Sequence, residues 1–290
     1  MLGPLFGDIL PYIDDMFGMS DTTEGLANIF WKMVLRMKRA GIRLHPQKLH
    51  ILDPKQKILG NYISDGYLHI DENKVKAIRE MPRPATVKQL RSYLGAVNYL
   101  KRYIDSFSKR CRPLYDLLAG ETPDSRAPII WNDACEEAFQ DLNDRLTRAP
   151  ALALARPDRK FVVTTDASKA GMGFILEQED EKKNRHIIEY GSKSFNETEK
   201  RWSSFSQELK AIVCAIDSFR HYLMSAKTFT VKTDCISCLH LRTMMGGCTR
   251  DIRNALHLSN YQFTLEHTPG TSNKVADCLS RVFHLSLIHI

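Results

Sequence analysis

The stretch KFVVTTDASKAGMGFILEQ, at residues 160–178, constrains the fold of this chain more than any other. It follows the period-two pattern of a β-strand up to Asp166, and a second apolar run comes after Gly171 and Gly173. Glycines leave room for a tight turn and for the close approach of another backbone. We therefore expect a hairpin with Asp166 at the end of its first strand. A carboxylate at the edge of an apolar sheet is costly to bury without a cation or hydrogen bonds, although an aspartate alone more often begins a polar turn.

Three further acids are placed where they could join Asp166. Glu208 lies in the first turn of an amphipathic helix pattern, on the shoulder of its apolar stripe. Asp234 ends a strand pattern at 228–233, and Asp277 lies in a short helical pattern that follows a Pro-Gly breaker. Two strand ends and two helix starts thus each provide one acid. Four acids without a basic residue beside them suit hard divalent cations with oxygen ligands, Mg²⁺ before Zn²⁺.

Four motifs, in this order and at these spacings, resemble the ribonuclease H domain of gypsy-type LTR retrotransposons. They are TTDAS at 164–168, SQELKAI at 206–212, KTD at 232–234 and the pattern PG-x-x-N-x-VAD-x-LSR that ends at Arg281. The resemblance implies a five-stranded mixed sheet with flanking helices. It also implies that two Mg²⁺ (or Mn²⁺) ions are bound by the catalytic acids Asp166, Glu208, Asp234 and Asp277. The family commonly has His after the third acid, where this chain has Cys235, so we expect substrate fit to be affected more than chemistry.

A second pair of acids lies near the start of the chain, where Asp14 and Asp15 separate two apolar runs. This pattern is typical of a hairpin, and a bare Asp-Asp pair is common in surface turns. With Tyr12 in front, however, it resembles the Y-x-D-D motif of reverse transcriptases. The resemblance implies a polymerase site with Asp14 and Asp15 as catalytic residues and Tyr12 as a nucleic-acid contact. The family also uses a third acid from an earlier strand. Asp8 is too close along the chain to be that residue, so we expect an incomplete site and no DNA polymerisation by this chain alone.

Helix and strand patterns fill the segments between these motifs. Residues 26–40 show the pattern of an amphipathic helix that is closed by Gly41. The apolar residues of this helix are Ile29, Met33, Leu35 and Met37. Short strand patterns occur at 48–50, 57–63 and 67–70, and helical patterns at 73–81, 86–94 and 131–149.

Residues 71–118 are helical in pattern and rich in Lys and Arg, and their run LRSYLGAVNYLKRYIDSFSK resembles the thumb of this family. Such a surface suits a phosphate backbone, with an affinity that is independent of base sequence and is weakened by salt. Solvated helix faces are the alternative. The side chains that we expect to contact nucleic acid are those of Lys101, Arg102, Lys109 and Arg110.

The resemblance implies a mixed α+β chain in consecutive parts. Residues 1–70 are expected to form the C-terminal part of a reverse transcriptase palm, 71–118 thumb-like helices, 119–157 a connecting segment and 158–281 a ribonuclease H-like domain. Residues 282–290, VFHLSLIHI, match nothing that we expect of the family. We interpret them as the mark of a truncation or of a cloning or assembly scar.

The charge of the chain fits a polyanionic partner, because its 290 residues carry a net charge of +7. Seven dispersed cysteines indicate reduced thiols. The sequence shows neither a signal peptide nor a long apolar run, so it gives no case for secretion or for a membrane span. We therefore expect a cytoplasmic location, in a virus-like particle, or a nuclear one. The residues Cys235, Cys238, His240 and Cys248 contain one C-x-x-C without a second pair, which is weak evidence for zinc.

The resulting hypothesis is a metal-dependent endonuclease that cuts the RNA strand of RNA–DNA hybrids. In the mechanism that the family uses, one metal lowers the pKa of a water molecule and another stabilises the leaving 3′ oxygen, the ions lying roughly 4 Å apart. Polymerase activity is expected only as part of a longer chain. Further expected partners are an upstream reverse transcriptase fragment, integrase or a second subunit. The alternative is a non-catalytic module, derived from a retroelement, that binds nucleic acid or protein.

Overall fold

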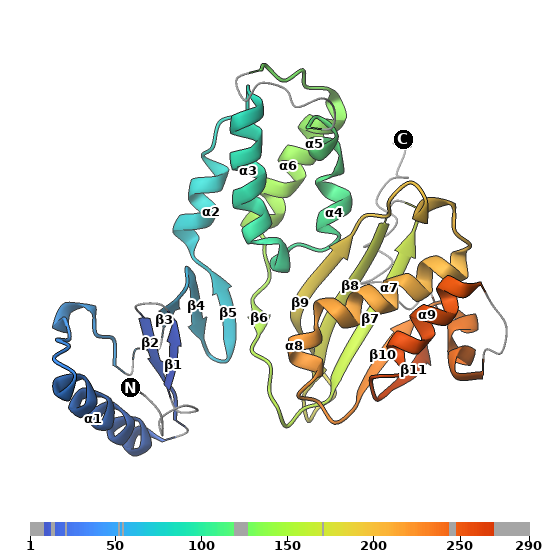
Figure 1. Ribbon diagram of the computed structural model, residues 1–290. Coiled ribbons are helices and arrows are strands. Elements are labelled where there is room, and N and C mark those ends of the chain that lie inside the picture. Colours follow the sequence, from blue (N-terminus) through green and yellow to red (C-terminus); the bar gives the residue numbers. More distant parts are fainter. Residues whose placement is uncertain are drawn as a thin grey trace. The chain divides into compact units, whose positions relative to one another are not determined.

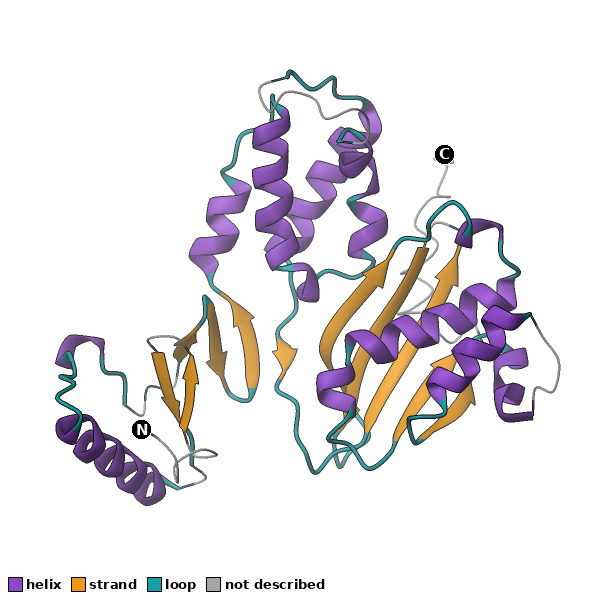
Figure 2. Ribbon diagram, in the orientation of Figure 1, coloured by secondary structure: helices purple, strands orange, loops and turns teal. Residues whose placement is uncertain are grey.

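A computed structural model of the chain describes residues 9–12, 15–20, 22–51, 53, 55–118, 127–169, 171–243 and 248–269 (Figure 1). The chain divides into two compact units, Met1–Asp53 and Pro54–Ile290. Both contain helices and strands, which confirms the expected mixed class (Figure 2). In the described ranges, none of the helices combines the length and the apolar character that crossing a membrane requires.

The first unit contains a hairpin and one long helix. Strands β1 (Ile9–Tyr12) and β2 (Asp15–Gly18) pair antiparallel, with Tyr12 opposite Asp15. Helix α1 (Thr23–Arg39) is capped by Thr22, whose Oγ1 accepts a hydrogen bond from the Gly25 N–H at 3.0 Å. The buried core of this unit contains Ile9, Ile29, Met33 and Met37.

Two expectations for this unit are wrong. Leu35 is 50% exposed, because it lies two residues after Met33 and therefore on the far side of a helix with 3.6 residues per turn. The strand expected at 48–50 is not found there, since a 3₁₀ turn occupies Pro46–Lys48. Pro46 at the first position of that turn already has the φ angle that a helical turn requires.

The second unit begins with a small antiparallel sheet. Its described strands follow the order β3 (Gln56–Ile58), β4 (Asn61–Ser64), β5 (Tyr67–Ile70) and β6 (Leu152–Ala153). The pattern at 57–63 predicts a single strand, but the chain reverses at Leu59 and Gly60, whose φ angles are 48° and 75°. Two successive positive φ angles are typical of a two-residue hairpin turn.

Helices α2 to α6 form a helical subdomain next to this sheet. They are α2 (Glu72–Arg79), α3 (Val87–Tyr99), α4 (Phe107–Arg110), α5 (Arg112–Asp116) and α6 (Asp133–Thr147). One apolar core joins them, in which Leu90, Leu114 and Leu142 are completely buried. Helix α6, from the expected connecting segment, thus packs with the expected thumb helices. Helix α3 runs beyond its expected end at Leu94, because Val97 in its last turn is buried in the same core.

The C-terminal part of the second unit is built on a mixed sheet. Among the described residues its strands follow the order β11-β10-β7-β8-β9, with β10 parallel to β7 and β11, and the other pairs antiparallel. The strands are β7 (Phe161–Ser168), β8 (Gly171–Glu179), β9 (Arg185–Lys193), β10 (Phe229–Thr233) and β11 (Phe263–His267). Helices α7 (Ser204–Ser218), α8 (Arg220–Leu223) and α9 (Thr249–Leu258) lie over one face of it (Figure 1). This arrangement confirms the five-stranded mixed sheet with flanking helices.

Arg110, a residue expected to bind nucleic acid, is instead held inside the helical subdomain. Its side chain is only 9% exposed, and it donates hydrogen bonds to Asp105 at 2.9 Å and to Asp141 at 2.7 Å. Arg145 forms ion pairs with the same two acids. The guanidinium of Arg110 therefore stabilises the packing of α4 against α6.

Arg102 is also engaged within the protein. It donates to Glu189 of β9 at 2.8 Å and to the hydroxyl of Tyr222 at 3.0 Å, and so joins the helical subdomain to the mixed sheet. The Arg110 guanidinium, at 9% exposure, is not placed to bind a phosphate without breaking its contacts, whereas the Arg102 side chain is 32% exposed. Nucleic-acid binding by Lys101, Arg102, Lys109 and Arg110 stays a prediction, and two of these side chains, those of Arg102 and Arg110, are engaged in ion pairs within the protein.

Replacement of Arg110 by Met is expected to lower the free energy of unfolding by about 1.5–3 kcal/mol, the range for hydrogen bonds to charged groups. The substitution leaves Asp105 and Asp141 facing each other with fewer donors. Denaturant unfolding of the full chain measures the effect. Lys88→Met, on the exposed side of α3, is the matched control and is expected to change stability by less than about 0.5 kcal/mol. Equal stability of the two variants would contradict the structural role of Arg110.

Candidate metal centre

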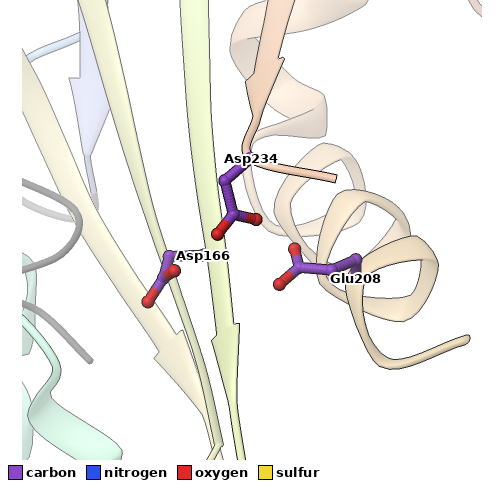
Figure 3. Close-up of side chains that lie close together, drawn as sticks. All are labelled: Asp166, Glu208 and Asp234. Atoms are coloured by element: carbon purple, nitrogen blue, oxygen red, sulfur yellow. The ribbon is translucent and has the colours of Figure 1, made fainter. Parts of the chain in front are cut away.

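Three carboxylates converge at one edge of the mixed sheet (Figure 3). Asp166 lies in β7, Asp234 directly follows β10, and Glu208 lies near the start of α7. One oxygen atom of each lies within 4.8 Å of the others, and no other such group of possible metal ligands occurs among the described residues. Because β7 and β10 are neighbouring parallel strands, their carboxyl ends meet at the same edge of the sheet.

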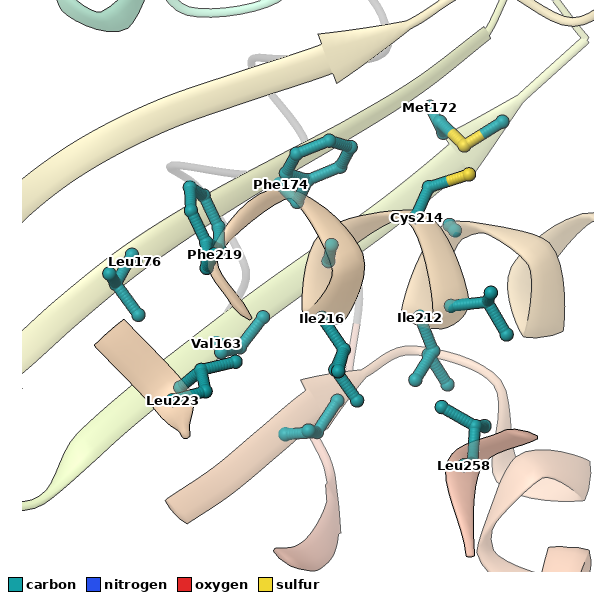
Figure 4. Packing of buried hydrophobic residues seen from close by; sticks show 14 of the residues in the cluster. Val163, Met172, Phe174, Leu176, Ile212, Cys214, Ile216, Phe219, Leu223 and Leu258 are labelled. Atoms are coloured by element: carbon teal, nitrogen blue, oxygen red, sulfur yellow. The ribbon is translucent and has the colours of Figure 1, made fainter. Parts of the chain in front are cut away.

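The hydrophobic core places α7 so that Glu208 reaches this edge. Ile212 and Ile216 of α7 belong to the same buried cluster as Val163 of β7 (Figure 4). The backbone N–H of Ala167 donates a hydrogen bond of 3.1 Å to Oε1 of Glu208. The helix that carries Glu208 and the strand that carries Asp166 are thus held together by packing and by a direct hydrogen bond.

Burial and repulsion act against the ionised form of Glu208. The residue is 4% exposed, and its Oε2 atom is buried without a hydrogen-bond partner among the described residues. Burial, followed by the negative charges of Asp234 and Asp166, raises the pKa of Glu208 to about 9. A buried carboxylate of this kind needs a cation to be stable as an anion. The orphan oxygen and the facing acids therefore fit a hard divalent cation with oxygen ligands, such as Mg²⁺ or Mn²⁺.

The other acids of the predicted sites lie outside the described residues or in the first unit. Asp277 and Asp14 lie outside the described residues. Asp15 and Tyr12 lie opposite each other in the hairpin of the first unit, where Tyr12 is 47% exposed. The roles of Asp277 in the metal centre and of Tyr12, Asp14 and Asp15 in a polymerase site stay predictions.

Cys235 and Cys238 form a turn directly after Asp234. The N–H of Cys238 donates to the carbonyl of Cys235 at 3.0 Å, and the hydrogen bond between their thiols lowers the pKa of Cys235 to about 6. In the part of the chain that the structure describes, no third metal ligand joins them. The candidate metal centre consists of carboxylates.

The surroundings of Asp166 on the side of the helical subdomain are a feature that sequence reasoning missed. Ser106, Lys109 and Lys193 line a small recess together with Asp166. The sequence predicts Lys109 on a nucleic-acid surface, but it does not predict Lys109 beside Asp166. No local pattern around either residue reports a contact between segments so far apart in the chain.

The chain is similar to proteins of retroelements. Residues 131–231 match the family model of the RNase H-like domain found in reverse transcriptase. The retrovirus-related Pol polyproteins from transposons opus, 297 and gypsy of Drosophila melanogaster are 31%, 30% and 28% identical to it, over 93%, 94% and 93% of the chain. The chain spans 28%, 25% and 26% of their lengths, about a quarter of each.

Solved structures share the fold. A foamy viral protease-reverse transcriptase in complex with an RNA/DNA hybrid matches 100% of this chain and 39% of its own chain, with a TM-score of 0.81 and 21% identity. The foamy viral protease-reverse transcriptase in complex with dsDNA matches 92% of this chain and 56% of its own, with a TM-score of 0.78 and 22% identity. The mixed sheet and the helical subdomain thus occur together in a known architecture.

Proposed function

This chain corresponds to a reverse transcriptase and ribonuclease H-like region of retrotransposon Pol polyproteins, and from that premise we propose that it cuts the RNA strand of RNA–DNA hybrids with divalent cations. The observation that carries the proposal is the convergence of Asp166, Glu208 and Asp234 around a buried carboxylate oxygen without a partner among the described residues. A solved protein of the same fold holds an RNA/DNA hybrid, which supports a hybrid as the substrate.

In this proposal the three acids hold Mg²⁺ or Mn²⁺, two ions per site, and Asp277 completes the ligand set. Bound there, the ions supply an activated water nucleophile and neutralise charge on the leaving oxygen. The chain's own residues supply placement. The Ala167 N–H orients the Glu208 carboxylate, and the adjacent strands set the separation of Asp166 and Asp234. Because the pKa of Glu208 is raised to about 9, this side chain must lose a proton when it becomes a metal ligand.

The test is a cleavage assay with the 290-residue chain and a hybrid whose RNA strand is labelled. Separate reactions contain Mg²⁺, Mn²⁺ or EDTA, and single-stranded RNA and duplex DNA serve as substrate controls. We expect cleavage of the hybrid RNA with either metal and none with EDTA. Tight hybrid binding without metal-dependent cleavage would overturn the proposal and support the non-catalytic binding module.

Lys101 is expected to contact the nucleic acid through its charge, because it is exposed at the 3₁₀ turn Lys101–Tyr103. Lys101→Gln should weaken hybrid binding without changing which RNA bonds are cut. It should also flatten the plot of log affinity against log salt by up to about 0.9. Binding is measured over a range of salt concentrations in EDTA, with Lys227→Gln, before the start of β10, as the charge-matched control. An unchanged salt slope for Lys101→Gln would place this residue outside the contact surface.

A further inference from the structure

Asp166 lies in a row of paired residues that runs across three strands. It pairs with Gly173 of β8, and Gly173 pairs with Ser192 of β9. Residues paired directly in this way project from the same face of a sheet. Since Gly173 has no side chain, the row itself places no side chain between Asp166 and Ser192 on that face.

Helix α4 is attached at the far end of this row. The N–H of Ser108 donates to Oγ of Ser192 at 2.8 Å, and Oγ of Ser108 donates to the carbonyl of Ser192 at 3.0 Å. Ser106, just before α4, has a φ of 48°, a left-handed conformation that is unfavourable for a non-glycine residue unless its surroundings impose it. Arg110, the last residue of α4, is held by two ion pairs. The chain on one side of Lys109 is therefore fixed to the mixed sheet through Ser108, and on the other side it is fixed to α6 through Arg110.

Lys109 approaches Asp166 from this helix. The two residues line the same small recess, with Ser106 at its start and Lys193 at the end of β9. The side chain of Lys109 in the helical subdomain and the carboxylate of Asp166 in the candidate metal centre therefore border the same space.

A cation at this position has a use in the proposed reaction. The carboxylates that bind metal also repel the phosphates of a nucleic-acid strand. An ammonium group is a compact charge that binds phosphate oxygens by charge-assisted hydrogen bonds. Because α4 is fixed in place, such a group can bind the charge that is spread over the phosphate oxygens in the transition state by turning its own side chain, without movement of the backbone.

We propose that the Lys109 ammonium binds the phosphate of the cleaved RNA strand at the edge of the acid cluster, so that the active centre is shared between the helical subdomain and the mixed sheet. This inference rests on the proposed ribonuclease function. Lys109 precedes residues 131–231, the segment that matches the family model. The ribonuclease H-like region alone thus lacks one of the groups that act on the substrate.

The test compares Lys109→Gln, Lys109→Arg and Lys227→Gln in the full chain, in single-turnover cleavage of a hybrid with Mg²⁺ titrated to saturation. Lys227→Gln removes the same charge at a residue before the start of β10, whereas Asp234 follows the end of that strand. The rate of this variant should equal that of the wild type. Lys109→Gln is expected to lower the saturated rate by about 10²-fold, the scale for loss of one fixed donor to the transition state. Lys109→Arg should keep most of the rate, and hybrid affinity in EDTA should fall much less than the rate.

A saturated rate for Lys109→Gln equal to that of Lys227→Gln would overturn the inference. If that unchanged rate were also reached at lower Mg²⁺, Lys109 would be a counter-ion of Asp166 that the metal displaces. Absence of cleavage by the wild-type chain is a distinct result, because it overturns the ribonuclease proposal itself and this inference with it.

Discussion

The Asp166→Asn variant is expected to lose hybrid cleavage by at least about 10³-fold, beyond the roughly 10²-fold that groups merely supporting a metal ligand contribute. Asp166 is 6% exposed, and its carboxylate shares the candidate metal centre with Glu208 and Asp234. An amide has nearly the same shape but carries no charge, so it is a poor ligand for a hard divalent cation. Single-turnover cleavage in Mg²⁺ measures the loss, and Asp234→Asn should behave in the same way.

The fold of Asp166→Asn is expected to remain intact. The substitution removes a negative charge beside Asp234 and the buried Glu208, so the metal-free variant should unfold at the same temperature as the wild type or higher. Asp158→Asn makes the same chemical change at an exposed residue before β7 and should leave cleavage unchanged. Cleavage by Asp166→Asn within about tenfold of the Asp158→Asn rate would contradict its role as a metal ligand.

Local patterns predict the elements that carry the acids because the information is local. The period-two residue pattern up to Asp166 and the glycines after it predict the hairpin, and β7 and β8 form that antiparallel pair. Likewise the run that ends at Thr233 predicts β10, with Asp234 as the next residue. The pairing of β7 with β10 is non-local, and it is implied by the resemblance to a known fold.

The charge pattern of residues 71–118 is a poorer predictor, because it does not distinguish a cation on the surface from a cation in an ion pair. The partner of Arg102 is Glu189, and one partner of Arg110 is Asp141, both outside that segment. Only the packing of α4 and the neighbouring 3₁₀ turn against α6 and β9 brings these groups together. The contact of Lys109 with the surroundings of Asp166 escapes sequence analysis for the same reason.

Binding of Mg²⁺ to the metal centre is expected to release about one proton, from Glu208, and to be strongly dependent on pH. The pKa of Glu208 is raised to about 9 in the metal-free fold, so the carboxyl group is mostly protonated at neutral pH. A metal ligand must be ionised, and the apparent Mg²⁺ affinity should therefore rise about tenfold per pH unit as pH 9 is approached from below. Calorimetric titrations in buffers with different ionisation enthalpies measure both the affinity and the number of protons released.

The stability of the metal-free protein should depend on pH with the opposite sign. The raised pKa means that, between the ordinary value of 4.5 and about 9, the folded state binds more protons at Glu208 than the unfolded state. The contribution of Glu208 therefore makes the free energy of unfolding fall as the pH rises through that window. Below the window this contribution is constant. Glu208→Gln removes the titrating group, so the variant should match the wild type near pH 5 and be more stable than it near pH 8 in EDTA. The contrary result is a free energy of unfolding that is equal for the wild type and Glu208→Gln from pH 5 to pH 8, together with an affinity for Mg²⁺ that does not depend on pH. It would show that Glu208 is already ionised in the metal-free fold and that another group balances its charge.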